Sequence, residues 1–239
     1  MLTTQQLPAE PDLMRTMTSC PLLPVLDTSN LRLVQEVFQP LPRHALGQAW
    51  LAKEESGFAP AFVRIGWRGD SLLVFAELTD ADIFNFATAH NQRAWELGDT
   101  FEIFLKPAGH PAYFEFQVTP NNQRVQLRFA NLDALENLRK KGPIESVLMP
   151  GEIFHSRTWI PPHAKCWYVY AEINAANLDN HTGSLQGKRW HFSFSRYDYT
   201  SWRKKPVISS TTPHAKPDFH CQQEWGMMTF DVLTPPSHP

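Results

Sequence analysis

Cysteine, glycine and long apolar runs are all scarce in this chain, and each shortage excludes a class of protein. The three cysteines among 239 residues are too few for a disulfide framework, and their spacing matches no zinc site. No stretch approaches the roughly 18 apolar residues of a transmembrane helix. The 11 glycines form no phosphate loop or dinucleotide fingerprint, and no Gly-x-Ser-x-Gly or His-Glu-x-x-His motif occurs.

An excess of charge is also missing. The chain has 22 Lys and Arg against 24 Asp and Glu, a formal net charge of −2. A nucleic-acid groove needs a basic excess to neutralise phosphate, so no nucleic-acid partner is expected, and no membrane partner either. The N-terminus lacks a cationic start followed by an apolar segment. This predicts a cytoplasmic protein, or alternatively a secreted one whose leader has been removed; the oligomeric state is not indicated.

Aromatic residues and proline are abundant. The chain has 16 Phe, 8 Trp and 5 Tyr, with 20 Pro, and 42% of its residues are hydrophobic. This composition excludes disorder of the whole chain and favours a β-rich fold with ordered loops. The length suggests one domain or at most two small ones.

Short segments of alternating polarity run through the middle of the chain and predict strands. The one expected helix covers residues 132–140 and stops at Gly142. Without a βαβ rhythm, the sequence predicts an all-β fold, an antiparallel β-sandwich of immunoglobulin or jelly-roll type with one short helix. The expected strands are residues 62–67, 71–78, 99–105, 113–119, 124–129, 153–160, 167–173, 189–196 and 227–232.

The same patterning predicts a domain organisation. Residues 1–26 are expected to be a weakly ordered extension, residues 27–233 a single β-sandwich domain, and residues 234–239 a tail.

Matching apolar positions on neighbouring strands predicts which side chains share a face. The apolar residues of 101–105, 114–118 and 125–129 are expected on one face. In the simplest register, Glu102 lies opposite Glu115, and Glu115 opposite Arg128. Facing carboxylates repel unless something compensates them. Arg128 or solvent is one explanation; the other is a polar platform for a hydroxylated ligand. The polar face would hold Glu102, Glu115, Gln117, Gln126 and Arg128.

One segment carries a resemblance to a known family. The stretch Glu77-Leu-Thr-Asp80, followed by Trp95-Glu-Leu-Gly-Asp-Thr-Phe-Glu-Ile-Phe-Leu105, resembles family 9 carbohydrate-binding modules and, more broadly, the DOMON-type β-sandwich superfamily. Gly98 is an insertion relative to the family's Trp-x-x-Asp-like motif. The resemblance covers about residues 60–232.

The resemblance implies a site where two aromatic rings sandwich a sugar. Trp95 matches the first ring and Phe219 the second, although Trp95 could instead be a core anchor. Glu102 matches the family's acidic strand residue and Asp80 the acid at a strand end, for which capping a turn is the alternative. Gln117 falls near the position of a family Arg.

Two further side chains, Arg196 and His220, are expected to add polar contacts to the sugar. The predicted function is therefore a non-catalytic carbohydrate-binding module. A Glu102–Glu115 pair would suit a retaining glycosidase, but an open sheet argues against catalysis. The protein could still accompany a glycoside hydrolase system.

No cofactor is expected. Family members hold calcium in acidic loops, but only Asp80 and Asp82 lie close together here, so calcium is doubtful. Two alternatives to sugar binding stay open. One is a haem-binding DOMON-type redox domain, with ligands from His90, Met149, His155 and His191. The other is a structural or interaction domain without a ligand.

Overall fold

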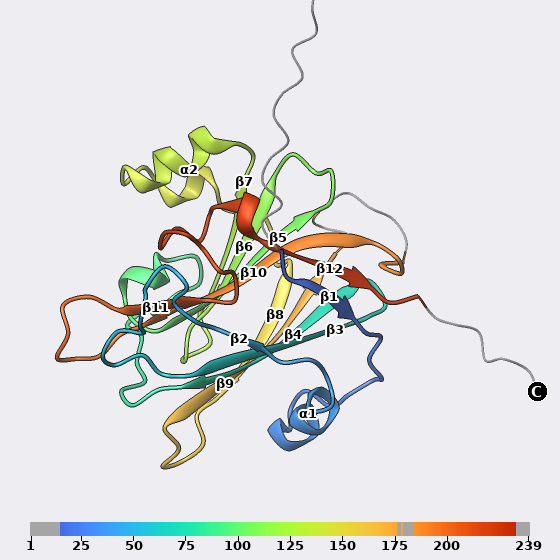
Figure 1. Ribbon diagram of the computed structural model, residues 1–239, viewed down its shortest axis with the longest axis horizontal. Coiled ribbons are helices and arrows are strands. Elements are labelled where there is room, and N and C mark those ends of the chain that lie inside the picture. Colours follow the sequence, from blue (N-terminus) through green and yellow to red (C-terminus); the bar gives the residue numbers. More distant parts are fainter. Residues whose placement is uncertain (1–14, 176–177, 179–183, 233–239) are drawn as a thin grey trace, which may run out of the picture.

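Two β-sheets pack face to face in the computed structural model, which describes residues 15–175, 178 and 184–232 (Figure 1). Sheet A runs in the order β1-β12-β10-β5-β6-β7, and β11 also pairs with β10. Its strands are β1 (Met17–Cys20), β5 (Thr100–Pro107), β6 (Tyr113–Val118), β7 (Arg124–Phe129), β10 (Arg189–Asp198), β11 (Val207–Ser210) and β12 (Gly226–Phe230).

Sheet B runs in the order β2-β3-β4-β9-β8. Within the described residues every strand pair is antiparallel except β1 with β12, which is parallel. The predicted all-β sandwich is therefore confirmed. The strands of sheet B are β2 (His44–Ala45), β3 (Ala61–Arg68), β4 (Ser71–Thr79), β8 (Phe154–Trp159) and β9 (Cys166–Asn174).

The main core lies between the two sheets. Side chains alternate along each strand, so one set from β5 and β6 meets one set from β3, β4 and β9. Phe101 and Phe194 stack with ring centroids 6.2 Å apart, and Phe116 meets Phe154 edge to face at 5.0 Å. These large rings account for the high aromatic content, because they fill the space between the sheets.

Each sheet is also covered on its outer face. Helix α1 (Leu31–Phe38) places Val34 and Phe38 against the outer face of sheet B, and α2 (Leu132–Arg139) covers the outer face of sheet A. The two helices lie on opposite sides of the sandwich (Figure 1). Since α2 buries the outer face of sheet A, polar side chains pointing there are shielded from bulk solvent.

Local sequence explains where both helices begin. The Asn131 side chain accepts a hydrogen bond from the Ala134 amide at the start of α2, and Asn30 does the same for Arg32 in α1. The prediction of α2 is confirmed, with Gly142 just beyond its end. Helix α1 was not predicted, although the apolar spacing of residues 31–38 after the Asn30 cap is typical of a helix.

In the part of the chain that the structure describes, three single-turn 3₁₀ helices shape the loops: η1 (Ala94–Glu96), η2 (Ile144–Ser146) and η3 (Gln222–Glu224). Among the described helices, none has the length and apolar character needed to cross a membrane.

The predicted register of β5, β6 and β7 was wrong. Glu102 pairs with Gln117, not Glu115, and Glu115 pairs with Phe104 and Leu127, not Arg128. Along β7 the face was also inverted. The apolar residues of β7 join the cluster on the outer face under α2, so Gln126 and Arg128 leave the polar face. The prediction failed because sheet A is apolar on both faces there, and patterning cannot then choose between them.

The predicted N-terminal boundary also differs from the structure. Residues 17–20, placed in the weakly ordered extension 1–26, form β1 and pair with Met227–Phe230 of β12. The sandwich therefore begins before residue 27. Residues 1–14 of the expected weakly ordered extension and the expected tail 234–239 lie outside the described residues.

The observed face of β7 gives a stability prediction. Leu127→Ala removes a fully buried side chain and should lower the free energy of unfolding by about 2–5 kcal/mol. Its neighbour Arg128 is exposed, and Arg128→Ala should change that free energy by less than about 0.5 kcal/mol. Urea denaturation of both variants measures these changes. Equal losses of unfolding free energy would mean that Arg128 is also buried, as in the face of β7 first predicted from the sequence.

Candidate functional site

A cavity of about 220 Å³ opens on the outer face of sheet A. Its floor holds Glu102 of β5, Glu115 of β6 and Tyr197 of β10, three neighbouring strands. Trp95 of η1 forms part of one wall, and Phe219 with its loop forms another. Leu135, Leu138 and Arg139 bring the buried side of α2 to the same cavity.

Strand alternation explains why two acids share this floor. Glu102 and Phe104 point outward from β5, and Glu115 points outward between Tyr113 and Gln117 of β6. Both carboxylates are only 3% exposed, because α2 and the 217–220 loop cover them.

Trp95 is half-buried and fixed at its backbone. Its carbonyl oxygen accepts a hydrogen bond from the Tyr199 hydroxyl at 2.7 Å. The Arg93 guanidinium carbon lies 5.5 Å from the centre of the indole ring. The ring packs against the outer cluster while still lining the cavity, so it offers a flat apolar surface of the kind that stacks on a ligand ring.

Phe219 is held firmly in its loop. It is 4% exposed and packs against Trp50 and Tyr197, with ring centroids 6.2 and 5.8 Å away. The indole nitrogen of Trp225 donates to the Phe219 carbonyl oxygen at 2.8 Å, which anchors the loop. Phe219 therefore contributes a rigid ring edge or face to the cavity rather than a mobile flap.

The two floor carboxylates share one donor. The amide nitrogen of Gln117 donates to Glu102 at 3.1 Å and also to Glu115. Burial, and then the Glu115 charge, raises the pKa of Glu102 well above its usual value. Burial raises the pKa of Glu115 to about 7, against the lowering effect of the Gln117 hydrogen bond. The pair therefore holds a proton near neutral pH.

His220 lies beside this pair in its neutral form. Burial, and then the Arg139 charge, lowers the pKa of His220 to about 3. Its Nδ1 lies 2.9 Å from the Tyr113 hydroxyl, and its Nε2 is 3.9 Å from a Glu115 oxygen, beyond hydrogen-bond distance. His220 thus brings a ring nitrogen to the cavity without bringing a charge.

Four of the seven residues predicted to contact a ligand line this cavity: Trp95, Phe219, Glu102 and His220. Gln117 does not line it, but its amide holds the two floor carboxylates. Asp80 and Arg196 lie elsewhere, because alternation along β10 turns Arg196 to the inner face, where it pairs with Asp80 at 3.0 Å. Neither of these two lines the cavity, so the structure does not bring all seven predicted residues together.

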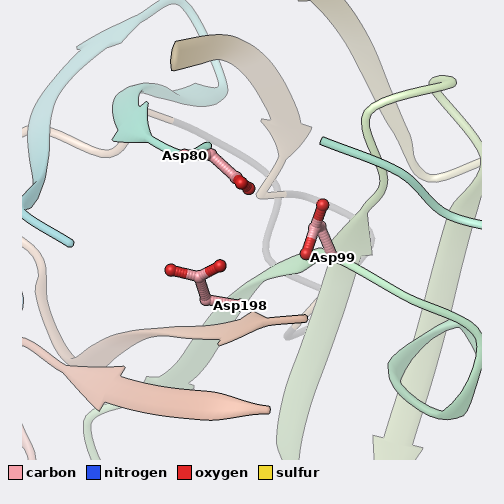
Figure 2. Close-up of side chains that lie close together, drawn as sticks. All are labelled: Asp80, Asp99 and Asp198. Atoms are coloured by element: carbon pink, nitrogen blue, oxygen red, sulfur yellow. The ribbon is translucent and has the colours of Figure 1, made fainter. Parts of the chain in front are cut away.

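Asp80, Asp99 and Asp198 form a separate buried cluster at the end of the sandwich. Figure 2 shows the three carboxylates turned toward a shared space, and ligand atoms from each lie within 4.8 Å of one another. Arg196 fills the role of counter-charge, with its guanidinium 3.0 Å from both Asp80 and Asp198. Both Asp99 oxygens accept backbone amides, from Phe84 and Tyr199.

This cluster does not fit a calcium ion. Calcium takes six to eight oxygen ligands, whereas five of the six carboxylate oxygens here are already held by backbone amides or by the Arg196 guanidinium. Burial, and then the Asp80 charge, raises the pKa of Asp99 to about 8, and burial raises the pKa of Asp198 to about 7. Asp82, the other residue considered for calcium, accepts from the Ser201 amide instead.

The four candidate haem ligands lie in different surroundings. Met149 is buried in the main core, His155 is exposed on β8, and His191 lies on β10. His90 lies beside Arg124, with its Nδ1 accepting from the Arg124 amide at 3.0 Å. Haem binding stays a prediction without support from this arrangement.

Several cavity residues were not predicted as ligand contacts. Glu115 was assigned to the polar face without being chosen, although its spacing from Gln117 already placed both on one side of β6. Tyr197, Leu138 and Arg139 had no local signal, because only tertiary packing brings β10 and α2 to the cavity.

Comparison with known proteins gives results at the level of structure. No protein-family model matches the chain, and no curated protein matches it. A solved structure of a candidate carbohydrate-binding protein from Bacteroides uniformis ATCC 8492 superposes with a TM-score of 0.67 at 17% identity, covering 91% of this chain and 100% of the other.

A family 9 carbohydrate-binding module from Caldicellulosiruptor kristjanssonii is similar in two solved forms. The cellotriose complex gives a TM-score of 0.60 at 16% identity, covering 94% of this chain and 97% of the other. The glucose complex gives 0.61 at 16% identity, covering 94% and 100%. The chain has the fold of a family 9 carbohydrate-binding module. The resemblance seen in the Trp95–Leu105 motif is thus confirmed for the fold, while the wider DOMON likeness stays a prediction.

The buried carboxylate pair predicts a pH-dependent stability. Folding raises the pKa of Glu102 and Glu115, so the folded state binds protons more tightly than the unfolded state. Their contribution is complete below about pH 4 and is lost as the pH rises through about 7. Glu102→Gln relieves the repulsion and should raise the free energy of unfolding at pH 8 by about 1–3 kcal/mol, with a smaller gain at pH 4.

Chemical denaturation of both proteins at pH 4 and pH 8 measures this difference. Glu36→Gln on the exposed side of α1 is the matched control and should show no pH-dependent gain. A Glu102→Gln variant that loses stability equally at both pH values would contradict a protonated, mutually repelling pair.

The aspartate cluster predicts indifference to calcium. Because Arg196 and the raised pKa values of Asp99 and Asp198 leave the cluster with little net negative charge, millimolar calcium should leave the melting temperature unchanged relative to EDTA. Scanning calorimetry of the native protein in both buffers measures this, and a rise of several degrees with calcium would show that the ion displaces the guanidinium.

Proposed function

We propose that this protein binds a saccharide without transforming it, in the cavity between Trp95, Phe219 and the floor carboxylates. The observation that carries the proposal is the meeting of a half-buried indole with two buried carboxylates in one cavity. A pyranose presents the complementary chemistry, because its C–H face suits an aromatic ring and its hydroxyl edge donates hydrogen bonds to carboxylates.

The cavity size favours a single sugar unit. Its volume of about 220 Å³ is below the roughly 300–1,000 Å³ of pockets that enclose drug-sized ligands. A chain end or a monosaccharide suits this space better than the middle of a polysaccharide. The solved complexes of the similar module with cellotriose and glucose support glucose and short glucans as first ligands to test.

Simple energetics predict weak binding. Covering about 100 Å² of apolar sugar surface contributes about 2–3 kcal/mol. Each hydrogen bond to a charged carboxylate adds about 1.5–3 kcal/mol, and association costs several kcal/mol. The dissociation constant is therefore expected between about 1 μM and 1 mM.

The placement of the two acids favours binding over hydrolysis. In a glycosidase, an acid and a nucleophile or base flank the scissile bond. Here Glu102 and Glu115 lie on adjacent strands beneath the cavity and are held together by the same Gln117 amide. Two acids on one side of a ligand suit hydroxyl recognition.

Trp95→Ala should weaken sugar binding, because it removes the stacking surface. In the native protein, glucose and cello-oligosaccharides should change the tryptophan fluorescence, and calorimetry should give a saturable isotherm. The Trp95→Ala variant should weaken affinity at least about tenfold, a change of about 1.4 kcal/mol.

The matched control is Trp202→Ala, which removes an indole that is 72% exposed and away from the cavity. It should retain native affinity. If Trp202→Ala lost sugar binding and Trp95→Ala kept it, the sugar site would lie outside the cavity. If the native protein bound no sugar in a broad panel, the proposed function would be wrong.

A further inference from the structure

The cavity floor contains more hydrogen-bond acceptors than donors. Across the described residues, Gln117 is the only group that donates a hydrogen bond to either floor carboxylate, and it does so through a single nitrogen. The side-chain oxygen of Gln117 is itself buried without a partner. Buried acceptors without donors are costly, so this floor is complementary to a ligand group rich in donors.

The floor also lacks a positive charge. Lys141 and Arg93 at the cavity rim pair with Glu96, and Arg139 pairs with Asp218. The other polar side chains at the floor are Tyr197, Tyr113 and His220, and all three are neutral. The low pKa of His220 leaves its ring uncharged.

The charged side chains that line the cavity are unequal in number. The cavity lining contains three cations, Arg93, Arg139 and Lys141, against four carboxylates, Glu96, Glu102, Glu115 and Asp218. The rim cations exceed the rim carboxylates by one, and the floor adds two carboxylates, so the cavity as a whole has one unmatched negative charge, which lies on the floor. Near neutral pH the proton held by the pair supplies this charge, and a ligand cation would take its place.

The aspartate cluster on the other side of sheet A shows how this fold balances buried acids elsewhere. There Arg196 extends a guanidinium between Asp80 and Asp198. Nothing equivalent reaches Glu102 and Glu115 from the described residues. Buried acids without a protein cation at an open cavity indicate that the ligand itself brings one.

We infer that the preferred ligand is an amino sugar with a free, protonated amine. This inference rests on the proposed function: the ring would stack on Trp95, and its ammonium group would lie between Glu102 and Glu115. An ammonium supplies three donors and one positive charge, the two things that the floor lacks. A neutral sugar supplies donors without the charge, and an N-acetylated sugar has neither the charge nor the three donors.

Calorimetric titration at pH 7 with glucosamine, glucose and N-acetylglucosamine tests the inference. The native protein should bind glucosamine about tenfold or more tightly than either neutral sugar. Glu102→Gln and, separately, Glu115→Gln should reduce that ratio toward one. Two variants are used so that misfolding of one does not decide the outcome, and circular dichroism verifies that each variant is folded.

Glu36→Gln, on the far side of the sandwich, serves as the control that removes one carboxylate without touching the cavity; it should keep the full preference. Equal binding of glucosamine and glucose by the native protein would overturn the amino-sugar inference and leave the proposed function standing. Binding of none of the three sugars would overturn both. A preference that survives in both cavity variants would also overturn the role given to the floor carboxylates.

Discussion

The burial of two carboxylates on the outer face of sheet A is the constraint on which the account of this protein depends. Glu102 and Glu115 reach that face by simple strand alternation, and α2 with the 217–220 loop then shields them from water. Only the Gln117 amide offsets the cost within the described residues. A fold selected for stability alone would favour apolar side chains at such positions, and this cost is the physical basis of the proposed ligand site.

The molecule contains two groups of buried acidic side chains, and their charges are compensated in different ways. In the aspartate cluster, whose three carboxylates are drawn in Figure 2, the Arg196 guanidinium pairs with Asp80 and Asp198, and backbone amides donate to Asp99. On the cavity floor no such cation is present among the described residues. This contrast separates an internal structural network from a site that faces an opening.

Sequence reasoning succeeded where periodicity was unambiguous. The strands expected at residues 71–78 and 189–196 are β4 and β10 in the structure, and the apolar pattern of each segment was enough to locate it along the chain. It failed on β7, where both faces of the sheet are buried and the apolar set of residues 125–129 fits either side. The parallel pairing of β1 with β12 was out of reach, since it depends on contacts about 210 residues apart along the chain.

The site was predictable in part for the same reasons. Trp95, Phe219, Glu102 and His220 meet in the cavity, whereas Arg196 was misplaced because the alternation along β10 was not followed from Tyr197, which points outward. The contribution of α2 could not be foreseen, because nothing local in residues 132–139 shows which sheet face the helix covers.

A crystal structure of the protein soaked with a sugar that binds in solution tests the central claim most directly. The account predicts a sugar ring against the Trp95 indole, with polar groups within hydrogen-bond distance of Glu102 or Glu115. A sugar bound elsewhere, for example at the exposed Trp202, with the cavity unchanged would contradict it.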